Sequence, residues 1–312
     1  MRRAIMIQGT AAQLDVKGLA GSLLALCLVI GLGPSAEARL LTDMAGRQVE
    51  LQEPPGRIVS LAPSLTEILF ALGAGDAVVG VTDYADYPPE VRKKVSVGGG
   101  LDPNLEVIVA LRPDLVLASA DTNRWDALLQ LERLKIPVFG VRPAGLEGVL
   151  TSIQKVGEVV GRLGQAEALI ATMRRRMAVV SEKVRGLARP QVLYVVWVDP
   201  LVVAGRGTVI DDLIRVAGGR NTVRAPGFPR YGLEEIFAHP PDLILLASDR
   251  GGRKDWKLLR RLPAWREMRA VREGAVRAID ATVVNRPGPR IAEAVELLAH
   301  LLHPEAFSEE SP

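Results

Sequence analysis

The sequence contains a single cysteine, Cys27, among its 312 residues. Cys27 lies in an apolar stretch near the N-terminus, so removal of that stretch would leave no thiol in the chain. A chain without cysteine has no disulfides, iron–sulfur clusters or thiol nucleophiles. We therefore expect the fold to be held together by its hydrophobic core, which 48% apolar residues can supply.

Histidine is also scarce: His239, His300 and His303 are the only ones, and all lie in the C-terminal part. A zinc or manganese ion held in a cleft between two lobes would draw nitrogen ligands from both, and the N-terminal part offers none. His239 and His303 are better explained as surface or capping residues. We therefore expect no metal site.

Motifs for nucleotide binding and hydrolysis are missing too. Gly98–Gly100 precede a predicted helix, but Leu101-Asp102 follow them in place of the Gly-Lys-Ser/Thr of a phosphate-binding loop. Gly205-Arg206-Gly207 lacks the third glycine of a dinucleotide site, since Ile210 stands there. The Gly-x-Ser-x-Gly elbow of a serine hydrolase does not occur in the sequence. We expect a protein that is not an enzyme, with no catalytic residues and no resident cofactor.

Charge of one sign is lacking as well, because 39 basic and 36 acidic residues give a net charge of only +3. A nearly balanced charge argues against nucleic acid as a partner. Aromatic residues make up only 4% of the chain, so those that fall in predicted loops carry more weight than usual.

The first 38 residues have the pattern of a secretory signal peptide. Lys17 precedes an apolar run of about 16 residues, which is short for a membrane span of roughly 20. Pro34 and the small-x-small sequence Ala36-Glu37-Ala38 follow, so we expect cleavage after Ala38 and a periplasmic protein. An uncleaved anchor is the alternative, and a lipoprotein signal fits less well because Leu26 precedes Cys27 where a small residue is required. Cleavage would leave 36 basic and 34 acidic residues.

Short apolar runs alternate with helical periods over most of the remaining chain. The expected strands are 57–61, 78–81, 115–118 and 137–141, and later 191–198, 242–248 and 276–280, with a closing helix over 291–302. Such alternation predicts parallel sheets flanked by helices. Residues 145–186 instead keep a helical period without a strand. Gly161 and Gly164 are expected to break it, leaving a helix of about 35 Å over 165–187.

These patterns predict an α/β fold with two parallel-sheet lobes, a single long helix between them, and a ligand cleft where the lobes meet. The expected divisions are a signal peptide over 1–38, an N-terminal lobe over 39–142, a helical spine over 143–188, a C-terminal lobe over 189–305 and a disordered tail over 306–312.

An internal repeat relates the two lobes. LEVIVALRPDL (105–115) and LEEIFAHPPDL (233–243) align without a gap, 128 residues apart. Chance recurrence of an amphipathic helix and a Pro-Asp turn would account for the apolar matches. Chance recurrence accounts less easily for Glu106 and Glu234, because each is expected at the exposed start of its helix, where core packing does not constrain the residue type.

Loops at the carboxyl ends of the predicted strands should form the cleft walls, where ligands bind in open α/β sheets. The residues of these loops that we expect to contact the ligand are Tyr84, Gly99, Trp197, Phe228, Arg286 and Arg290. Aromatic faces and guanidinium groups suit a large, flat, partly anionic small molecule. As alternatives, Trp197 is a core residue, and Arg286 and Arg290 pair with acids or cap the last helix.

Five segments together resemble the periplasmic substrate-binding proteins of ABC importers for vitamin B12, haem and ferric siderophores: RIVSLAPSLTEILFALGAG, VGVTDYADYPPE, NLEVIVALRPDLVLAS, AGGRN and RPGPR. The resemblance covers roughly residues 40–305. It implies the class III fold, a monomer with small hinge motion, and a dimeric inner-membrane permease with its ATPase as partner. It also implies that Glu106 and Glu234 dock onto arginines of the two permease subunits.

Within this family, TDYADYPPE and the RPGPR…LLHPE ending are most similar to the cobalamin-binding branch. The resemblance implies that Tyr84 and Arg286 contact the ligand, and that Phe228 replaces a tryptophan over the corrin. Gly98–Gly100 and Ser119 stand where cobalamin receptors carry two further tryptophans, so the cleft is expected to be wider. Haem or a ferric siderophore is the alternative ligand, with Tyr84, Tyr87 and Tyr231 as candidate axial donors.

Overall fold

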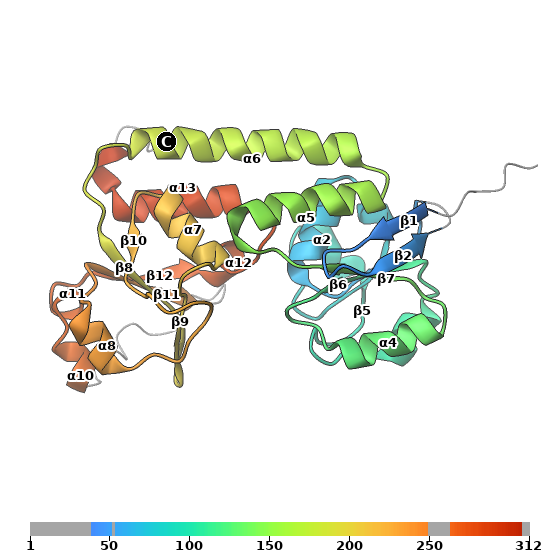
Figure 1. Cartoon of the computed structure of the whole chain (residues 1–312), viewed down its shortest axis with the longest axis horizontal. Coiled ribbons are helices and arrows are strands. Elements are labelled where there is room, and N and C mark those ends of the chain that lie inside the picture. The colour runs from blue at the N-terminus through green and yellow to red at the C-terminus, as the bar shows by residue number, and fades with distance from the viewer. Residues whose placement is uncertain (1–38, 52–53, 249–262, 308–312) are drawn as a thin grey trace, which may run out of the picture. The chain divides into compact units, whose positions relative to one another are not determined.

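The computed structural model describes residues 39–51, 54–248 and 263–307 (Figure 1). Arg39–Pro312 form one compact unit, which is described here by itself. The predicted signal peptide and its cleavage site lie outside the described residues. Among the helices of the described part, none is both long and apolar enough to cross a membrane.

The N-terminal lobe is built on a five-stranded parallel sheet. Its strand order is β5 (Val95–Ser96), β4 (Val78–Val81), β3 (Ile58–Ser60), β6 (Leu115–Ser119) and β7 (Val138–Val141). The helices of this lobe are α2 (Pro63–Ala71), α3 (Leu105–Ala110) and α4 (Trp125–Arg133). An antiparallel hairpin, β1 (Arg39–Thr42) with β2 (Gln48–Leu51), precedes them. The four strands expected in this lobe are confirmed to within one residue at each end.

The C-terminal lobe has a second parallel sheet of order β10 (Arg220–Asn221), β8 (Gln191–Val198), β11 (Leu243–Ser248) and β12 (Val276–Asp280). A short strand, β9 (Leu201–Val203), pairs antiparallel with β8. The helices of this lobe are α7 (Val209–Val216), α8 (Leu233–Ala238), α10 (Pro263–Arg266), α11 (Arg269–Arg272), α12 (Ala281–Val284) and α13 (Ile291–Leu302). The predicted α/β fold with two parallel sheets is therefore confirmed.

Both faces of each sheet are covered, and the strand sequences show why. In β6, Leu115 and Leu117 enter a large core, while Val116 and Ala118 enter a separate core beneath α3 and α4. In β8, Val192 and Tyr194 enter the same large core, whereas Leu193 and Val195 pack beneath α8, α10 and α11. Successive side chains of a strand point to opposite faces, so a strand buried on both sides reads as a continuous apolar run.

Two helices connect the lobes. α5 (Gly145–Val159) and α6 (Leu163–Lys183) are separated at Gly161, whose φ of +66° favours glycine. The predicted break at Gly161 is therefore confirmed, but Gly164 lies inside α6, which begins two residues before the expected start. α6 packs across α5 and α13 (Figure 1), and the large core runs through α5 and α6 into both lobes.

The chain remains packed beyond the expected start of the tail at residue 306. Pro304–Ala306 form a short 3-10 helix, and the buried Phe307 lies with its ring centroid 4.3 Å from that of His300. Residues 308–312 lie outside the described residues.

Gly205 of the Gly205-Arg206-Gly207 sequence lies where two backbone segments of the C-terminal lobe pack closely, which explains why glycine stands there. Its amide donates to Gly227 O at 2.8 Å, and an added Cβ would collide with the backbone carbonyl of Ala225. Because backbone cannot rotate away, we expect Gly205→Ala to lower the free energy of unfolding by about 3 kcal/mol in urea denaturation. Gly164→Ala is the control, since an added Cβ there meets no atom within 4 Å and the helix should be unchanged or slightly more stable.

Candidate ligand cleft

Two adjoining cavities lie at the carboxyl ends of the strands. The first, of about 570 Å³, is lined mainly by the N-terminal lobe, and we call it the N-side pocket. The second, of about 500 Å³, is lined mainly by the C-terminal lobe, and we call it the C-side pocket. Ser119, Thr122, Asn285 and Pro287 line both, so the pockets form one continuous cleft with walls from both lobes. This is the position expected for a ligand in sheets of this kind.

The N-side pocket takes its wall from the loops that follow β3, β4, β5 and β6. Tyr84 lies in the loop after β4 and leaves 70% of its surface exposed, which makes its ring available to a ligand. Gly99 also lines the pocket, and a Cβ added there would meet no heavy atom within 4 Å. The predicted open space at this wall is therefore present, and the structure places Tyr84 and Gly99 in the same pocket.

Asn123 holds three of these loops in register, and the sequence did not single it out. Its Oδ1 accepts a hydrogen bond from the Ser119 amide at 2.6 Å, and its Nδ2 donates to Leu61 O at 3.1 Å and to Gly100 O. The side chain is almost completely buried. A buried amide with its hydrogen bonds satisfied fixes loop positions well.

The C-side pocket contains Phe228 but not Trp197. Phe228 lines the pocket with more than half of its surface exposed. Trp197 lines neither pocket, and its Nε1 donates to Asp199 O at 2.7 Å in the β8–β9 hairpin. The preceding residue, Val196, faces the pocket instead. Adjacent strand residues point to opposite faces, so the Trp197 side chain faces away from the cleft.

Arg286 and Arg290 meet a buried glutamate that the sequence analysis missed. Arg290 Nε lies 2.9 Å from Glu67 Oε2, and an Arg290 Nη lies 2.7 Å from Glu67 Oε1. Arg286 donates to the same Glu67 Oε1 at 3.1 Å and to Asp86 Oδ1 at 2.6 Å. We call these four residues the lobe-bridging cluster, because the acids belong to the N-terminal lobe and the arginines to the C-terminal lobe.

The Glu67–Arg290 pair is shielded from water, with 2% of the Glu67 side chain and 10% of the Arg290 side chain exposed, whereas Asp86 at the edge of the cluster is 31% exposed. Burial lowers the pKa of the Arg290 guanidinium, but the hydrogen bonds and charge of Glu67 outweigh it, so the net pKa is raised. Arg290 also lies 4.4 Å above the Tyr87 ring and lines neither pocket. The alternative that the arginines pair with acids is therefore realised, and of the two only Arg286 retains a place in the cleft wall.

Glu106 and Glu234 lie outside the cleft, in the first turns of α3 and α8. Both are exposed, and within the described part of the chain neither carboxylate makes a hydrogen bond or an ion pair. The repeated aspartates behave differently. Asp114 accepts from the Gly56 and Arg57 amides, and Asp242 accepts from the Gln191 amide at 2.8 Å. The aspartates thus have a structural role at the start of a neighbouring strand, and the glutamates have none.

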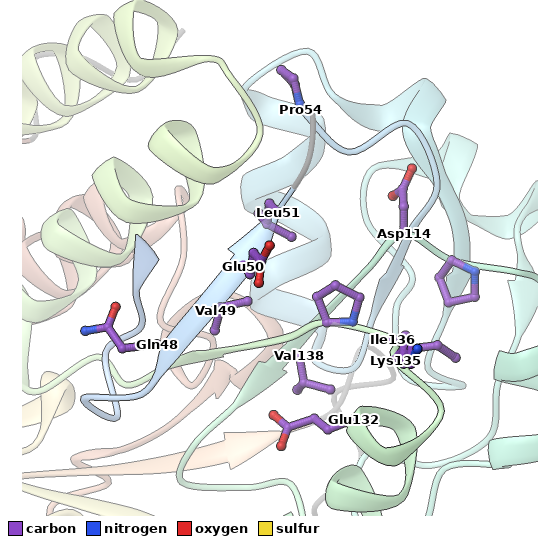
Figure 2. A pocket seen from close by; sticks show the side chains of 12 residues that line it. Gln48, Val49, Glu50, Leu51, Pro54, Asp114, Glu132, Lys135, Ile136 and Val138 are labelled. Atoms are coloured by element: carbon purple, nitrogen blue, oxygen red, sulfur yellow. The ribbon is translucent and has the colours of Figure 1, made fainter. Parts of the chain in front are cut away.

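A third cavity, of about 600 Å³, lies at the opposite ends of the N-terminal strands. Figure 2 shows Val49 and Leu51 of the β1–β2 hairpin on one side, and Glu132 and Val138 on the other. Two of its charged groups are engaged in the fold, since Glu132 pairs with Arg47 and Asp114 accepts backbone hydrogen bonds. This cavity carries no aromatic side chain in its wall, so the cleft remains the better ligand site.

Within the described residues, no group of three His, Cys, Asp or Glu side chains is placed to hold a metal ion. No histidine of the described chain lines either pocket of the cleft. The cleft instead presents aromatic rings, hydroxyls, amides, the Arg286 guanidinium and the carboxylates of Asp102 and Asp121.

Comparison with known proteins agrees with this architecture. The periplasmic binding protein family is matched over residues 58–283. The ABC transporter substrate-binding lipoprotein YvrC of Bacillus subtilis is 34% identical over 277 residues, which cover 86% of this chain and 87% of the relative. This chain is a periplasmic binding protein. Its family membership places it outside the cytoplasm, and its relatives are substrate-binding proteins of ABC transporters.

Two further relatives of this periplasmic binding protein differ in the ligand that they are named for. A cobalamin-binding protein of Halobacterium salinarum is 32% identical over 272 residues, covering 84% of this chain and 73% of the relative. The solved structure of the haem-binding protein RhuT from Roseiflexus sp. RS-1, in its apo form, is 30% identical with a TM-score of 0.73. It covers 80% of this chain and 98% of RhuT.

Proposed function

We propose that this periplasmic binding protein captures cobalamin or a related corrinoid and delivers it to a dimeric ABC permease. The observation that carries the proposal is the continuous cleft, in which Tyr84 and Phe228 present exposed rings from two adjoining pockets. Exposed rings suit the faces of a flat macrocycle, and hydroxyl and amide groups between them suit its polar edge. The 32% identity to a cobalamin-binding protein supports the same ligand class.

Haem is the second candidate, favoured by the similarity to RhuT and by Tyr84. An iron porphyrin is commonly held by an axial protein donor such as tyrosinate. The other two candidate donors are poorly placed: Tyr87 and Tyr231 line neither pocket, and one face of the Tyr87 ring lies against Arg290. Burial and the nearby Glu235 also raise the pKa of Tyr231, which disfavours its phenolate. The cleft therefore offers haem one donor at most among the tyrosines, and the corrinoid is preferred.

As a carrier, the protein needs neither catalytic residues nor a resident cofactor, and we propose that it works without them. Export through a signal peptide cut after Ala38 would yield a mature chain beginning at Arg39. We further propose that the mature monomer docks through Glu106 and Glu234, one on each permease subunit. A pseudo-duplicated receptor can present the same acid twice to a two-fold symmetric partner.

Calorimetric titration of the mature chain decides between the two ligands. We expect saturable binding of cyanocobalamin at micromolar concentration or below, with one ligand per chain, and no saturable binding of haemin in that range. Phe228→Ala should weaken cyanocobalamin binding by roughly tenfold, because a stacking face is lost. Val179→Ala, an exposed apolar change on α6, is the control and should have no effect. Binding of haemin without cyanocobalamin would refute the corrinoid assignment and favour the second candidate.

A further inference from the structure

The two copies of the internal repeat expose more than an acid. Their burial patterns match at corresponding positions, with Ile108 and Ile236 buried and Glu106 and Glu234 exposed. Three residues after each glutamate stands an exposed apolar residue: Val109 is 38% exposed and Phe237 is 47% exposed. These two residues occupy the same position of the repeat.

Residues three apart are neighbours on the surface of a helix. Each helix therefore presents a carboxylate and an apolar side chain together, with an exposed alanine beside them. We call these sets the acid–apolar faces: Glu106, Val109 and Ala110 on α3, and Glu234, Phe237 and Ala238 on α8. A single exposed apolar residue is ordinary on a protein surface. The same combination at equivalent places in two lobes is harder to ascribe to chance.

The fold does not require either face. α3 and α8 are anchored by Ile108 and Ile236, which enter the two cores on the sheet faces away from α5 and α6. Because the glutamates are unpaired among the described residues, the faces carry uncompensated negative charge next to apolar surface. Such a surface is complementary to a basic group set in an apolar surround.

We propose that each acid–apolar face docks as a unit on one subunit of the permease, with Val109 and Phe237 packing around the ion pair that the glutamate forms. This inference rests on the proposed function, since it takes the permease dimer as the partner. An ion pair left in water contributes about 0–1 kcal/mol, whereas apolar side chains that exclude water from it allow a larger contribution. The apolar residues thus increase the binding free energy that each glutamate's ion pair contributes.

The two faces contribute unequally. A two-fold symmetric partner offers the same pocket twice, and phenylalanine fills such a pocket with more apolar surface than valine. Phe237→Ala is therefore expected to weaken permease binding roughly 30-fold, and Val109→Ala roughly 3-fold. Neither residue lines the cleft, so neither change should alter ligand affinity.

The test measures binding of the cyanocobalamin-loaded mature chain to the cognate permease–ATPase complex in nanodiscs, at low and high salt. Phe237→Ala should lower the affinity and make it more sensitive to salt, because the ion pair is then exposed to screening, whereas Glu234→Ala should lower the affinity and flatten the salt dependence. Phe237→Leu should retain most of the affinity. Val179→Ala, whose side chain is 52% exposed on α6, is the matched control and should bind like the wild type.

Two different results would show that the acid–apolar faces are not the contact, or that the protein does not deliver its ligand to the permease. If the wild type docks and Phe237→Ala and Val109→Ala dock equally well, the acid–apolar faces are not the contact and the inference is wrong, while the proposed function stands. If the wild type binds cyanocobalamin but does not dock on the complex, the delivery function falls and the inference with it.

Discussion

The double variant Glu106→Ala/Glu234→Ala is expected to bind cyanocobalamin like the wild type and to lose transport. Neither glutamate lines the cleft, and neither carboxylate supports the fold through a hydrogen bond or ion pair within the described residues. Truncating one partner of a desolvated charge pair costs about 2–5 kcal/mol of binding free energy. Loss of two such pairs would lower permease affinity by more than about a thousandfold.

Uptake of labelled cyanocobalamin into proteoliposomes that contain the permease–ATPase complex measures this effect. The matched control is Glu90→Ala/Glu273→Ala, which removes one exposed acid from each lobe outside helices α3 and α8. This control should transport at the wild-type rate. Wild-type uptake by the Glu106/Glu234 double variant would refute the paired-acid account.

Loss of Glu67 is expected to be the most destabilising of the single substitutions considered. Glu67→Ala leaves the guanidinium groups of Arg286 and Arg290 facing a buried site without their shared carboxylate. Removing one partner of a buried ion pair typically costs 3–5 kcal/mol, and we expect a loss of about 4 kcal/mol in the free energy of unfolding. Urea denaturation followed by circular dichroism gives the value.

A double-mutant cycle shows whether this loss arises from the lobe-bridging cluster. Removing Arg290 together with Glu67 should cost less than the sum of the two single changes, because the uncompensated charge disappears. Glu296→Ala is the control, since Glu296 pairs with Arg176 at the surface with 33% of its side chain exposed. That change should cost about 1 kcal/mol or less. Strict additivity in the cycle would show that Glu67 and Arg290 do not stabilise the fold as a pair.

The fold was predictable because its signals are local. Strand runs, Pro-Asp turns and the strand-free segment around Gly161 each depend on a few neighbouring residues, and the structure places the strands within one or two residues of expectation. The two-residue strands β5 and β10 and the hairpin strand β9 were not predicted, because two or three residues are too few to show the alternating pattern of a strand.

The site was less predictable because it depends on pairs far apart in the sequence. Glu67 and Arg290 are separated by 223 residues, and the sequence alone does not bring them together. A signal was nevertheless present: Glu67 stands in α2, where the residues from Ser64 to Leu69 are all buried. A charged residue in an otherwise apolar helix needs a partner, and two arginines in RPGPR were available.

The strand end at Trp197 shows a different limit. Sequence places it near the carboxyl end of β8, but which of two adjacent side chains faces the cleft depends on which face of the sheet is turned toward it. Val196 continues the face of Val192 and Tyr194 and lines the C-side pocket, so Trp197 lies on the other face. A shift of one residue reverses the face to which a side chain points, and only the structure resolves it.

Identifying the ligand that co-purifies with the protein tests the central claim most directly. The full chain would be expressed in cells supplied with both cobalamin and haem, purified without denaturation, and examined by absorption spectroscopy and native mass spectrometry. The account predicts the visible bands of a corrin and the mass of one corrinoid per chain beginning at Arg39. A Soret band with the mass of haem would contradict it.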